Sequence, residues 1–165
     1  MNAGTTPHRL SGRERIALLV HRQVDRRLSR LGVWLMLRTR GSLAKRYGVH
    51  ALVLSTVGRK TGRQRDVVLQ YFPDGDAFVV VATNDGGATD PAWYLNLMAR
   101  RRAEVHIAGQ RTSVVPERLE GEEAAGWWAR ILELSPDYER YARATDRAFP
   151  VVRLVPAAGP ASSAA

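Results

Sequence analysis

From residue 51 onward the sequence consists of short β-prone runs separated by turn residues, and this texture limits the folds open to the chain. Such runs cover 51–57, 66–72, 77–83, 103–108, 111–119 and the proline-bounded 150–156. Turn signals, among them Pro73-Asp74-Gly75-Asp76 and Gly109-Gln110, stand between neighbouring runs. The pattern predicts an α+β protein with an antiparallel sheet or barrel of about six strands rather than a series of βαβ units.

Two helices are expected between these strands. Asp90 places a capping side chain before Pro91, a proline at the first helical position, and this predicts a short helix over 92–99. Apolar residues at helical spacing predict a second helix over 122–134. Pro136 ends that helix or restarts the chain in a new direction.

The first forty residues differ in character from the rest. Ser11 and Glu14 form a capping box, and the apolar residues that follow recur at helical spacing among many arginines. We therefore expect a basic amphipathic helical extension over 11–40, after a flexible stretch over 1–10. This helix packs on the barrel, the reading we favour, or makes peripheral contact with a membrane surface. The small-residue tail, 157–165, is expected to be disordered.

Length and composition limit the kinds of site. A chain of 165 residues, 45% hydrophobic, fits one domain, which we place at 41–156. It contains no cysteine, and its four histidines show no metal-ligand spacing, so no metal site is expected. No apolar segment reaches the ~20 residues of a spanning helix, and no secretory signal is visible, so the expected location is cytoplasmic, with the inner face of the membrane as the alternative. The formal net charge of +9 favours anionic partners.

Two loops carry candidate binding groups. The segment Gly58-Arg59-Lys60-Thr61-Gly62-Arg63-Gln64-Arg65 offers cations, a hydroxyl and backbone amides to a phosphate or carboxylate, although it also fits a solvated basic turn. Its glycine spacing is not that of a nucleotide-binding P-loop. The segment 83–91 joins a strand to a helix start, where amides suit an anion. Behind it, Asn96 is unusual inside a helix.

Four separated motifs together resemble the deazaflavin-dependent nitroreductase family. They are Leu54-Ser55-Thr56-Val57-Gly58-Arg59-Lys60-Thr61-Gly62, Val80-Val81-Ala82-Thr83-Asn84-Asp85-Gly86-Gly87, Pro91-Ala92-Trp93-Tyr94-Leu95-Asn96-Leu97, and Asp137-Tyr138-Glu139-Arg140-Tyr141 with Pro150-Val151-Val152. The resemblance runs in order from about residue 53 to 156 and implies a split β-barrel like that of flavin-binding oxidoreductases. It also implies coenzyme F420, which carries a phosphate and a polyglutamate tail.

The same resemblance implies the site residues. Coenzyme-binding residues would be Arg59, Lys60, Thr61, Arg65, Asp66, Val67, Val68, Leu69, Gln70, Val81, Ala82, Thr83, Asn84, Ala92, Trp93, Tyr94, Leu95 and Asn96. Acceptor-binding residues would be Gln70, Thr83, Ser135, Tyr138 and Tyr141, with Tyr138 as the catalytic residue. Gln70 stands at a position that is often aromatic in the family, and Ser135 at one that is often tyrosine in its nitroimidazole-reducing member. A changed pocket wall is therefore expected, and nitro reduction itself need not carry over.

The expected function is therefore an oxidoreductase that passes hydride from reduced F420 to a small organic acceptor, such as a quinone, an enone or a nitroaromatic, with the proton supplied by Tyr138 or water. Two alternatives keep the barrel: an FMN- or haem-binding protein, and a non-catalytic binder of deazaflavin or polyanions. Nucleic acid is not expected, because the aromatic residues are not interleaved with the basic loop. The protein is expected to be a monomer or a homodimer.

Overall fold

The computed structural model describes residues 33–34, 37–38 and 50–157. The expected N-terminal helix is described only at Val33, Trp34, Leu37 and Arg38, which are helical. The rest of that helix with its capping box, the flexible stretch 1–10 and the tail from residue 158 lie outside the described residues. Within the described part, no helix is long and apolar enough to cross a membrane.

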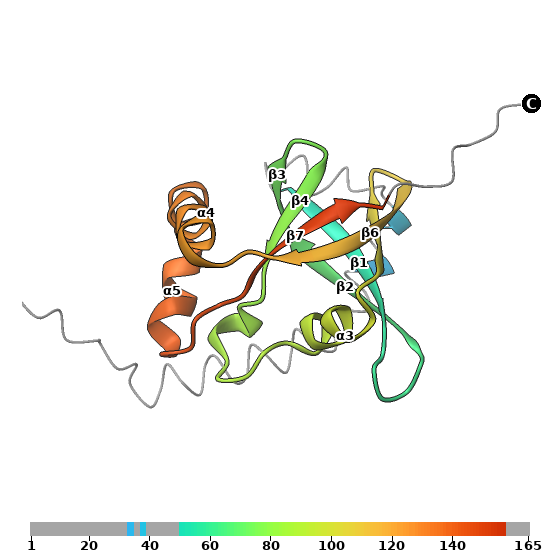
Figure 1. Ribbon diagram of the computed structural model, residues 1–165, viewed down its shortest axis with the longest axis horizontal. Coiled ribbons are helices and arrows are strands. Elements are labelled where there is room, and N and C mark those ends of the chain that lie inside the picture. Colours follow the sequence, from blue (N-terminus) through green and yellow to red (C-terminus); the bar gives the residue numbers. More distant parts are fainter. Residues whose placement is uncertain (1–32, 35–36, 39–49, 158–165) are drawn as a thin grey trace, which may run out of the picture.

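The seven strands of the described ranges form a single antiparallel sheet (Figure 1). The strands are β1 (Ala51–Val57), β2 (Gln64–Gln70), β3 (Phe72–Asp74), β4 (Ala77–Val81), β5 (Ala103–Ile107), β6 (Gln110–Arg118) and β7 (Val151–Pro156). Their order across the sheet is β2-β1-β5-β6-β7-β4-β3, and every neighbouring pair is antiparallel. The predicted antiparallel architecture is confirmed.

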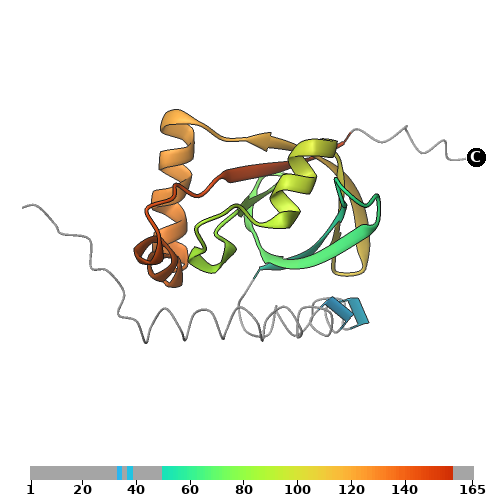
Figure 2. The same cartoon turned by 90° about the horizontal axis from the view of Figure 1, so that it is seen from below.

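The sheet curls because its two edge strands are joined by a single residue. β2 and β3 lie at opposite ends of the strand order, yet only Tyr71 separates them in the chain. The Tyr71 amide donates to the His50 carbonyl at 2.9 Å, and its ring packs edge-on against Phe78. The curled sheet encloses an interior, as Figure 2 shows from below. One predicted strand over 66–72 is therefore wrong: the chain changes edges at Tyr71, which also raises the strand number from about six to seven.

The predicted hairpins are confirmed, with one shift in the turn. β5 and β6 are joined by Ala108 and Gly109, both at positive φ, 52° and 84°. Two consecutive positive φ angles are the signature of a type I′ hairpin turn, which matches the twist of the flanking strands. The turn thus begins one residue earlier than Gly109-Gln110. Gly75, at φ 57°, closes the turn between β3 and β4.

Alternation along the strands creates two cores, one on each face of the sheet. In β4, Val80 belongs to the inner core, whereas Val79 and Val81 belong to the outer one. Helix α3 (Ala92–Arg100) supplies Tyr94 and Leu97 to the inner core, so the predicted short helix is confirmed and packs against the barrel interior.

Two helices pack on the other face. α4 (Gly121–Leu134) matches the predicted second helix, and it contributes the fully buried Ile131 to the outer core. After the corner at Ser135 and Pro136 the chain restarts as α5 (Asp137–Ala144), which Figure 1 shows beside α4. Pro136 therefore begins a new helix, the second of its two expected roles.

Candidate functional site

The basic loop between β1 and β2 is a closed turn. The amides of Gly58 and Gly62 donate to the carbonyls of Arg63 and Gly58, each at 2.8 Å. A Cβ on Gly58 would lie 2.8 Å from Thr61 Oγ1 and 3.2 Å from the Arg63 carbonyl oxygen, so a side chain at this position would require the turn to shift. Gly62 adopts a φ of 66°, a conformation that glycine takes without cost. The exposed basic side chains of this turn are Arg59, Lys60, Arg63 and Arg65.

Helix α3 holds this loop in place through Asn96. Asn96 Oδ1 accepts a hydrogen bond from the Arg59 amide at 3.1 Å and another from Arg59 Nη1 at 3.3 Å. Asn96 is buried, and its burial inside a helix is explained by these two bonds. The predicted site residue Asn96 therefore touches the basic loop, and through it the helix positions the loop's cations.

Strand β2 lies at one edge of the strand order. It pairs with β1 alone among the described strands, so its other edge carries backbone N–H and C=O groups that no described strand pairs. Arg65, Val67 and Leu69 lie opposite inward-facing residues of β1, whereas Asp66 and Val68 lie on the other face. The predicted stretch 65–70 therefore shares one strand edge but not one face. Along that edge, alternate residues of the strand direct their N–H and C=O groups outward, away from β1.

The segment after β4 carries unusual backbone conformations. A short 3-10 helix, η1 (Asn84–Gly86), contains Asn84 and Asp85 at φ of 50° and 53°. Two adjacent non-glycine residues in the left-handed region are strained, and such strain is concentrated at functional sites. Asn84 Nδ2 donates to the Thr89 carbonyl at 2.9 Å and holds the loop closed. The predicted site residues Thr83 and Asn84 thus lie in a preformed loop.

Arg147 organises this loop and was not predicted from the sequence. Its Nη1 donates to Asp90 Oδ1 at 2.6 Å, and its other nitrogens donate to the carbonyls of Gly87, Ala82 and Thr83 at 3.1, 3.0 and 2.8 Å. Asp90 therefore does not cap α3, as the sequence had suggested; Pro91 occupies the cap position instead. The Asp90 carboxylate instead pairs with Arg147, which is distant in the sequence.

Tyr138 lies in the outer aromatic cluster that α5 forms with the sheet. Its ring meets Phe72, Trp128 and Tyr141 edge-on at centroid distances of 6.0, 6.3 and 5.6 Å. Burial raises the pKa of the Tyr138 phenol well above its usual range, and the charges of Tyr141 and Asp85 raise it further. The phenol therefore stays protonated across the physiological range and keeps the hydrogen that a hydrogen-bond donor needs.

Helix α5 packs directly on η1. A Cβ on Gly86 would lie 2.7 Å from Ala144 Cβ and 3.0 Å from the Tyr141 carbonyl, so the missing side chain permits the contact. The predicted acceptor residues Tyr138 and Tyr141 are thus placed next to the strained loop. Residues of the second and fourth sequence motifs, Gly86 and Tyr141, are therefore neighbours in space.

Two further predicted residues meet each other. Gln70 Nε2 donates to Ser135 Oγ at 2.7 Å, across 65 positions of sequence. Gln70 ends the edge strand, and Ser135 forms the corner between α4 and α5. The bond fixes the helix that carries Tyr138 to the end of β2, and it places both residues at the rim that was predicted to contact the acceptor.

These contacts link the candidate segments into a closed ring. It runs from the basic loop to α3, through the loop that Arg147 holds to η1, on to α5, and back through Ser135 and Gln70 to β2. Not every predicted residue is free to bind a ligand. Tyr94 and Ala82 belong to the inner core and Val81 to the outer one, while Trp93 and Leu95 pack half-buried against the inner core and Ala92 is exposed.

The groups around this ring suit an anionic organic ligand. One side offers guanidinium and ammonium groups, a threonine hydroxyl and tightly turned backbone, all suited to phosphate or carboxylate. The part of the ring at α5 offers two tyrosines, and the phenol of Tyr138 is held protonated. Within the described ranges no three His, Asp or Glu side chains gather as a metal site. The donor set fits a long cofactor with an anionic part and an aromatic part.

Comparison with known proteins agrees with this geometry. The family model described as F420H(2)-dependent quinone reductase matches residues 28–156. An F420H(2)-dependent quinone reductase of Mycobacterium tuberculosis H37Rv is 35% identical over 107 residues, which are 63% of this chain and 72% of that protein.

Two solved structures are similar to the fold as well. A structure named as an F420-H2 dependent reductase shows a TM-score of 0.57 at 30% identity, covering 63% of this chain and 92% of the other. A domain-swapped dimer shows the same TM-score of 0.57 at 29% identity, covering 73% and 96%.

Proposed function

This chain belongs to the F420H(2)-dependent quinone reductase family, and from that premise we propose that it binds coenzyme F420 and transfers hydride from the reduced coenzyme to a small organic acceptor, of which a quinone is the first candidate. It is an oxidoreductase with a split β-barrel fold. The observation that supports this function most directly is the closed ring, in which the basic loop leads into one end of β2 and the corner before the tyrosine-bearing α5 is bonded to the other end.

The anionic part of the coenzyme lies at the basic loop in this proposal. Lys60 and Arg65 supply charge, Thr61 supplies a hydroxyl, and Arg59 is pre-positioned by Asn96. The backbone edge of β2 and the loop at Thr83 and Asn84 hold the rest of its length. Because the loop is already closed by its own hydrogen bonds, little order has to be gained on binding.

The aromatic side of the ring is where the acceptor binds. When bound, reduced F420 supplies the hydride. Tyr138 and Tyr141 form an apolar wall against which a flat acceptor packs, and Gln70 and Ser135 border it. The Tyr138 phenol is held protonated, so it donates a hydrogen bond to an acceptor oxygen, and water or this phenol delivers the proton.

A titration with purified coenzyme tests this proposal. F420 is added to the apo protein and its fluorescence is followed, and the reduced form is then mixed with a menadione-like quinone. We expect saturable binding and quinone-dependent oxidation of the coenzyme. If the purified protein instead carries FMN or haem by its absorbance spectrum and leaves F420 fluorescence unchanged, the assignment is wrong.

Removing positive charge from the basic loop tests whether the anionic part of the coenzyme binds there. Lys60→Ala with Arg65→Ala is expected to weaken coenzyme binding, with each charge-assisted contact contributing roughly 1.5–3 kcal/mol at most and less where water reaches it. The matched control removes two exposed arginines elsewhere, Arg118→Ala with Arg130→Ala, and should leave affinity within about twofold. Equal losses in the two double variants at low salt would show a general field effect rather than a site.

A further inference from the structure

Part of the outer face of the sheet is buried, although none of the helices α3, α4 and α5 packs on it. On this face of β1, Val53 is 1% exposed and Ser55 is 7% exposed. Val53 belongs to neither of the two cores. Helix α3 packs inside the barrel, while α4 and α5 cover the outer face at β3, β4 and β7, toward the other end of the strand order. These three helices therefore do not account for the burial at β1.

A second buried valine indicates which part of the chain covers this face. Val33 is buried and, like Val53, belongs to neither core. Its helical neighbours Trp34 and Leu37 are 56% and 44% exposed, so the chain here is packed on one side and open to solvent on the other. Val33 follows directly on the segment 11–32, which lies outside the described residues. The N-terminal chain thus has a point of packing just before β1.

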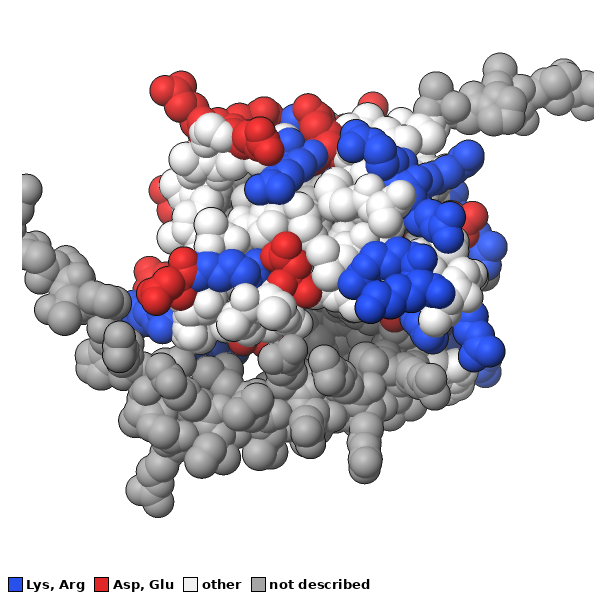
Figure 3. Space-filling view, turned by 60° about the horizontal axis from the view of Figure 1, so that its bottom comes forward, with Lys and Arg blue, Asp and Glu red and all other residues white. Residues whose placement is uncertain are grey.

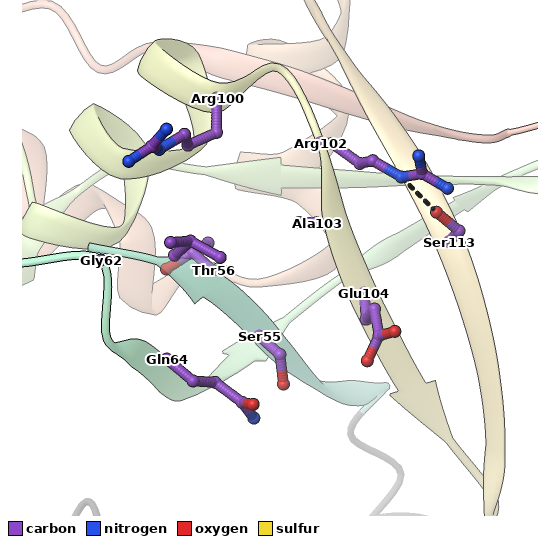
Figure 4. Close-up of a pocket in the computed structure, with 10 residues that line it drawn as sticks. Ser55, Thr56, Gly62, Gln64, Arg100, Arg102, Ala103, Glu104 and Ser113 are labelled. Carbon is purple, nitrogen blue, oxygen red and sulfur yellow. Dashed lines mark hydrogen bonds between the residues drawn. The ribbon is translucent and has the colours of Figure 1, made fainter. Parts of the chain in front are cut away.

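The buried face carries two rows of side chains across β2, β1 and β5. The first row is Val68, Val53 and His106, and the second row is Asp66, Ser55 and Glu104. Figure 4 shows Ser55 and Glu104 pointing to the same side of their strands. Ser55 Oγ lies 3.2 Å from His106 Nε2, so these two polar groups bond to each other and need no partner from a covering element. The first row therefore accepts an apolar cover, while the second offers two carboxylates.

The sequence of the N-terminal segment has the pattern that this face requires. Between residues 11 and 31 the apolar side chains recur at helical spacing, at Ile16, Val20, Val24, Leu28 and Leu31. Arginines supply much of the remainder, at positions 13, 15, 22, 26, 27 and 30. A helix with this pattern places an apolar stripe against one row of the face and cations beside the other row.

Charge favours this segment over other covers of the same face. Lys and Arg side chains gather on one side of the molecule (Figure 3), and the net charge is +9, so a basic segment is attracted only where acids are local. Asp66 and Glu104 provide such acids on either side of Ser55, while Arg111, beside His106, lies one strand further on β6. An anionic lipid surface would meet the same two carboxylates and be repelled by them.

We propose that the segment 11–31 docks as a helix on the outer face of β2, β1 and β5. Its apolar stripe covers Val53 and Val68, and its arginines lie beside Asp66 and Glu104. Burial of the stripe supplies most of the stabilisation, because ion pairs at an exposed rim contribute little. The segment is then a structural part of the domain that supports the strand following the basic loop, whatever ligand the loop binds.

Thiol accessibility tests this docking, because the chain contains no cysteine of its own. Ser55→Cys places a thiol beneath the docked segment, and Ala129→Cys places one on the exposed side of α4 as a reference. In the full-length chain, the reagent DTNB should react with the first at least about tenfold more slowly than with the second. Adding Val24→Glu with Leu28→Glu, which puts charge into the apolar stripe, should remove most of that protection.

A matched control adds the same two charges outside the stripe. Gln23→Glu with Ser29→Glu should leave the protection within about twofold. Val105→Cys, inside the barrel, should stay unreactive in every background, which separates undocking from global unfolding. If the thiol of Ser55→Cys reacts as fast as the reference, or if both double variants change its rate equally, the docking is wrong.

Two further results would assign the face to another partner. Protection that is lost on dilution, together with a halving of the mass in sedimentation, would show that a second copy of the chain covers the face. Protection that appears only when vesicles of anionic lipid are added would show that a membrane covers it. Either result would overturn the docking of the segment.

Discussion

Arg147 and Asp90 form a charged pair at 2.6 Å that joins the strand end of the candidate site to the segment before β7. Their side chains are 16% and 30% exposed, so the pair is largely withdrawn from water. The same guanidinium also satisfies three backbone carbonyls, at Ala82, Thr83 and Gly87. Only the planar fork of arginine serves four acceptors at once, which makes the position specific for it.

Arg147→Met is expected to destabilise the protein and disorder the loop at Thr83. Removing the cation leaves the Asp90 carboxylate and the three carbonyls without this donor, a cost of roughly 2–4 kcal/mol in the free energy of unfolding. Arg147→Lys keeps the charge but loses the fork, so it should recover part of the stability and little of the coenzyme affinity. Denaturant unfolding and fluorescence titration measure the two effects separately.

An arginine on the surface of α5 provides the control for that experiment. Arg143 pairs with Glu139 at 2.6 Å in an exposed i, i+4 arrangement. Arg143→Met should cost at most about 0.5 kcal/mol. A comparable loss from both substitutions would show that Arg147 contributes no more than an ordinary surface charge.

Asn96 is predicted to act on coenzyme binding through Arg59. Asn96→Leu removes the oxygen that holds the Arg59 amide and guanidinium, so the basic loop becomes less ordered and affinity falls by about tenfold, the equivalent of one to two hydrogen bonds. All the cations remain, so the dependence of affinity on salt should keep its slope. In the double variant Lys60→Ala with Arg65→Ala, by contrast, coenzyme affinity should depend less steeply on salt concentration. A reduced slope in Asn96→Leu would mean that its effect is not loop ordering.

Arg153 ties the far side of the barrel together. Its Nε donates to Asp74 Oδ2 at 2.6 Å, Nη1 to Glu117 Oε2 at 3.2 Å and Nη2 to Glu123 Oε1 at 2.5 Å, so it connects β7 to β3, β6 and α4. The hydrogen bond to Glu123, followed by that to Asp74, raises the pKa of Arg153, which stays charged at every practical pH. The arginine therefore compensates three carboxylates that would otherwise repel one another.

Arg153→Met is expected to lower the free energy of unfolding by roughly 2–4 kcal/mol, through lost bonds and repulsion among the three acids. Raising the ionic strength should recover part of the loss because salt screens that repulsion. Coenzyme affinity at low denaturant should be unchanged, because no residue of the proposed site touches this network. Thermal unfolding at two salt concentrations is the measurement; a loss that does not respond to salt would assign the effect to packing alone.

The strands could be predicted because their information is local. Ala51–Val57 has the predicted limits, and the 103–108 and 111–119 runs became β5 and β6 with shifts of one residue. The change of sheet edge at Tyr71 could not be predicted, because the alternation of residues is the same on both sides of it. Which edge a strand joins is decided by its partners, β1 for β2 and β4 for β3.

In the candidate site, too, residues that belong to a local sequence pattern could be predicted, whereas residues whose partners lie far away in the chain could not. The basic loop and the position of Asn96 were visible as sequence patterns, and the bond between them explains why both occur. Arg147 carries no local signal: it is one arginine among many, and its partner Asp90 was interpreted as a helix cap because a proline follows it. Helix α5 was missed because its sequence, Asp-Tyr-Glu-Arg-Tyr-Ala-Arg-Ala, is mostly charged and buries few residues. Only contact with η1 reveals its role.

Tyr138 provides the last prediction, which separates a proton donor from a hydrogen-bond donor. Efficient acid catalysis requires a pKa near the working pH, and burial moves the Tyr138 pKa away from that range. We therefore expect Tyr138→Phe to slow turnover of a menadione-like quinone by about tenfold, the effect of one lost hydrogen bond, rather than by the ~10²–10⁴ of a positioned acid. Coenzyme affinity should change little, because the ring and its aromatic neighbours remain.

The same substitution should change the response of the fold to alkaline pH. Because the folded state raises the Tyr138 pKa, the unfolded chain loses this proton first, and the stabilisation present below about pH 10 is lost as pH rises further. Tyr138→Phe removes that contribution, so the stability difference between variant and parent should shift in favour of the variant as pH rises above about 10, where the tyrosine of the unfolded chain loses its proton and that of the folded chain keeps it. If turnover instead slows by roughly a hundredfold or more, with coenzyme affinity and this alkaline difference both as expected, the phenol is the proton donor despite its raised pKa. Unchanged turnover would restrict Tyr138 to packing and leave protonation to water.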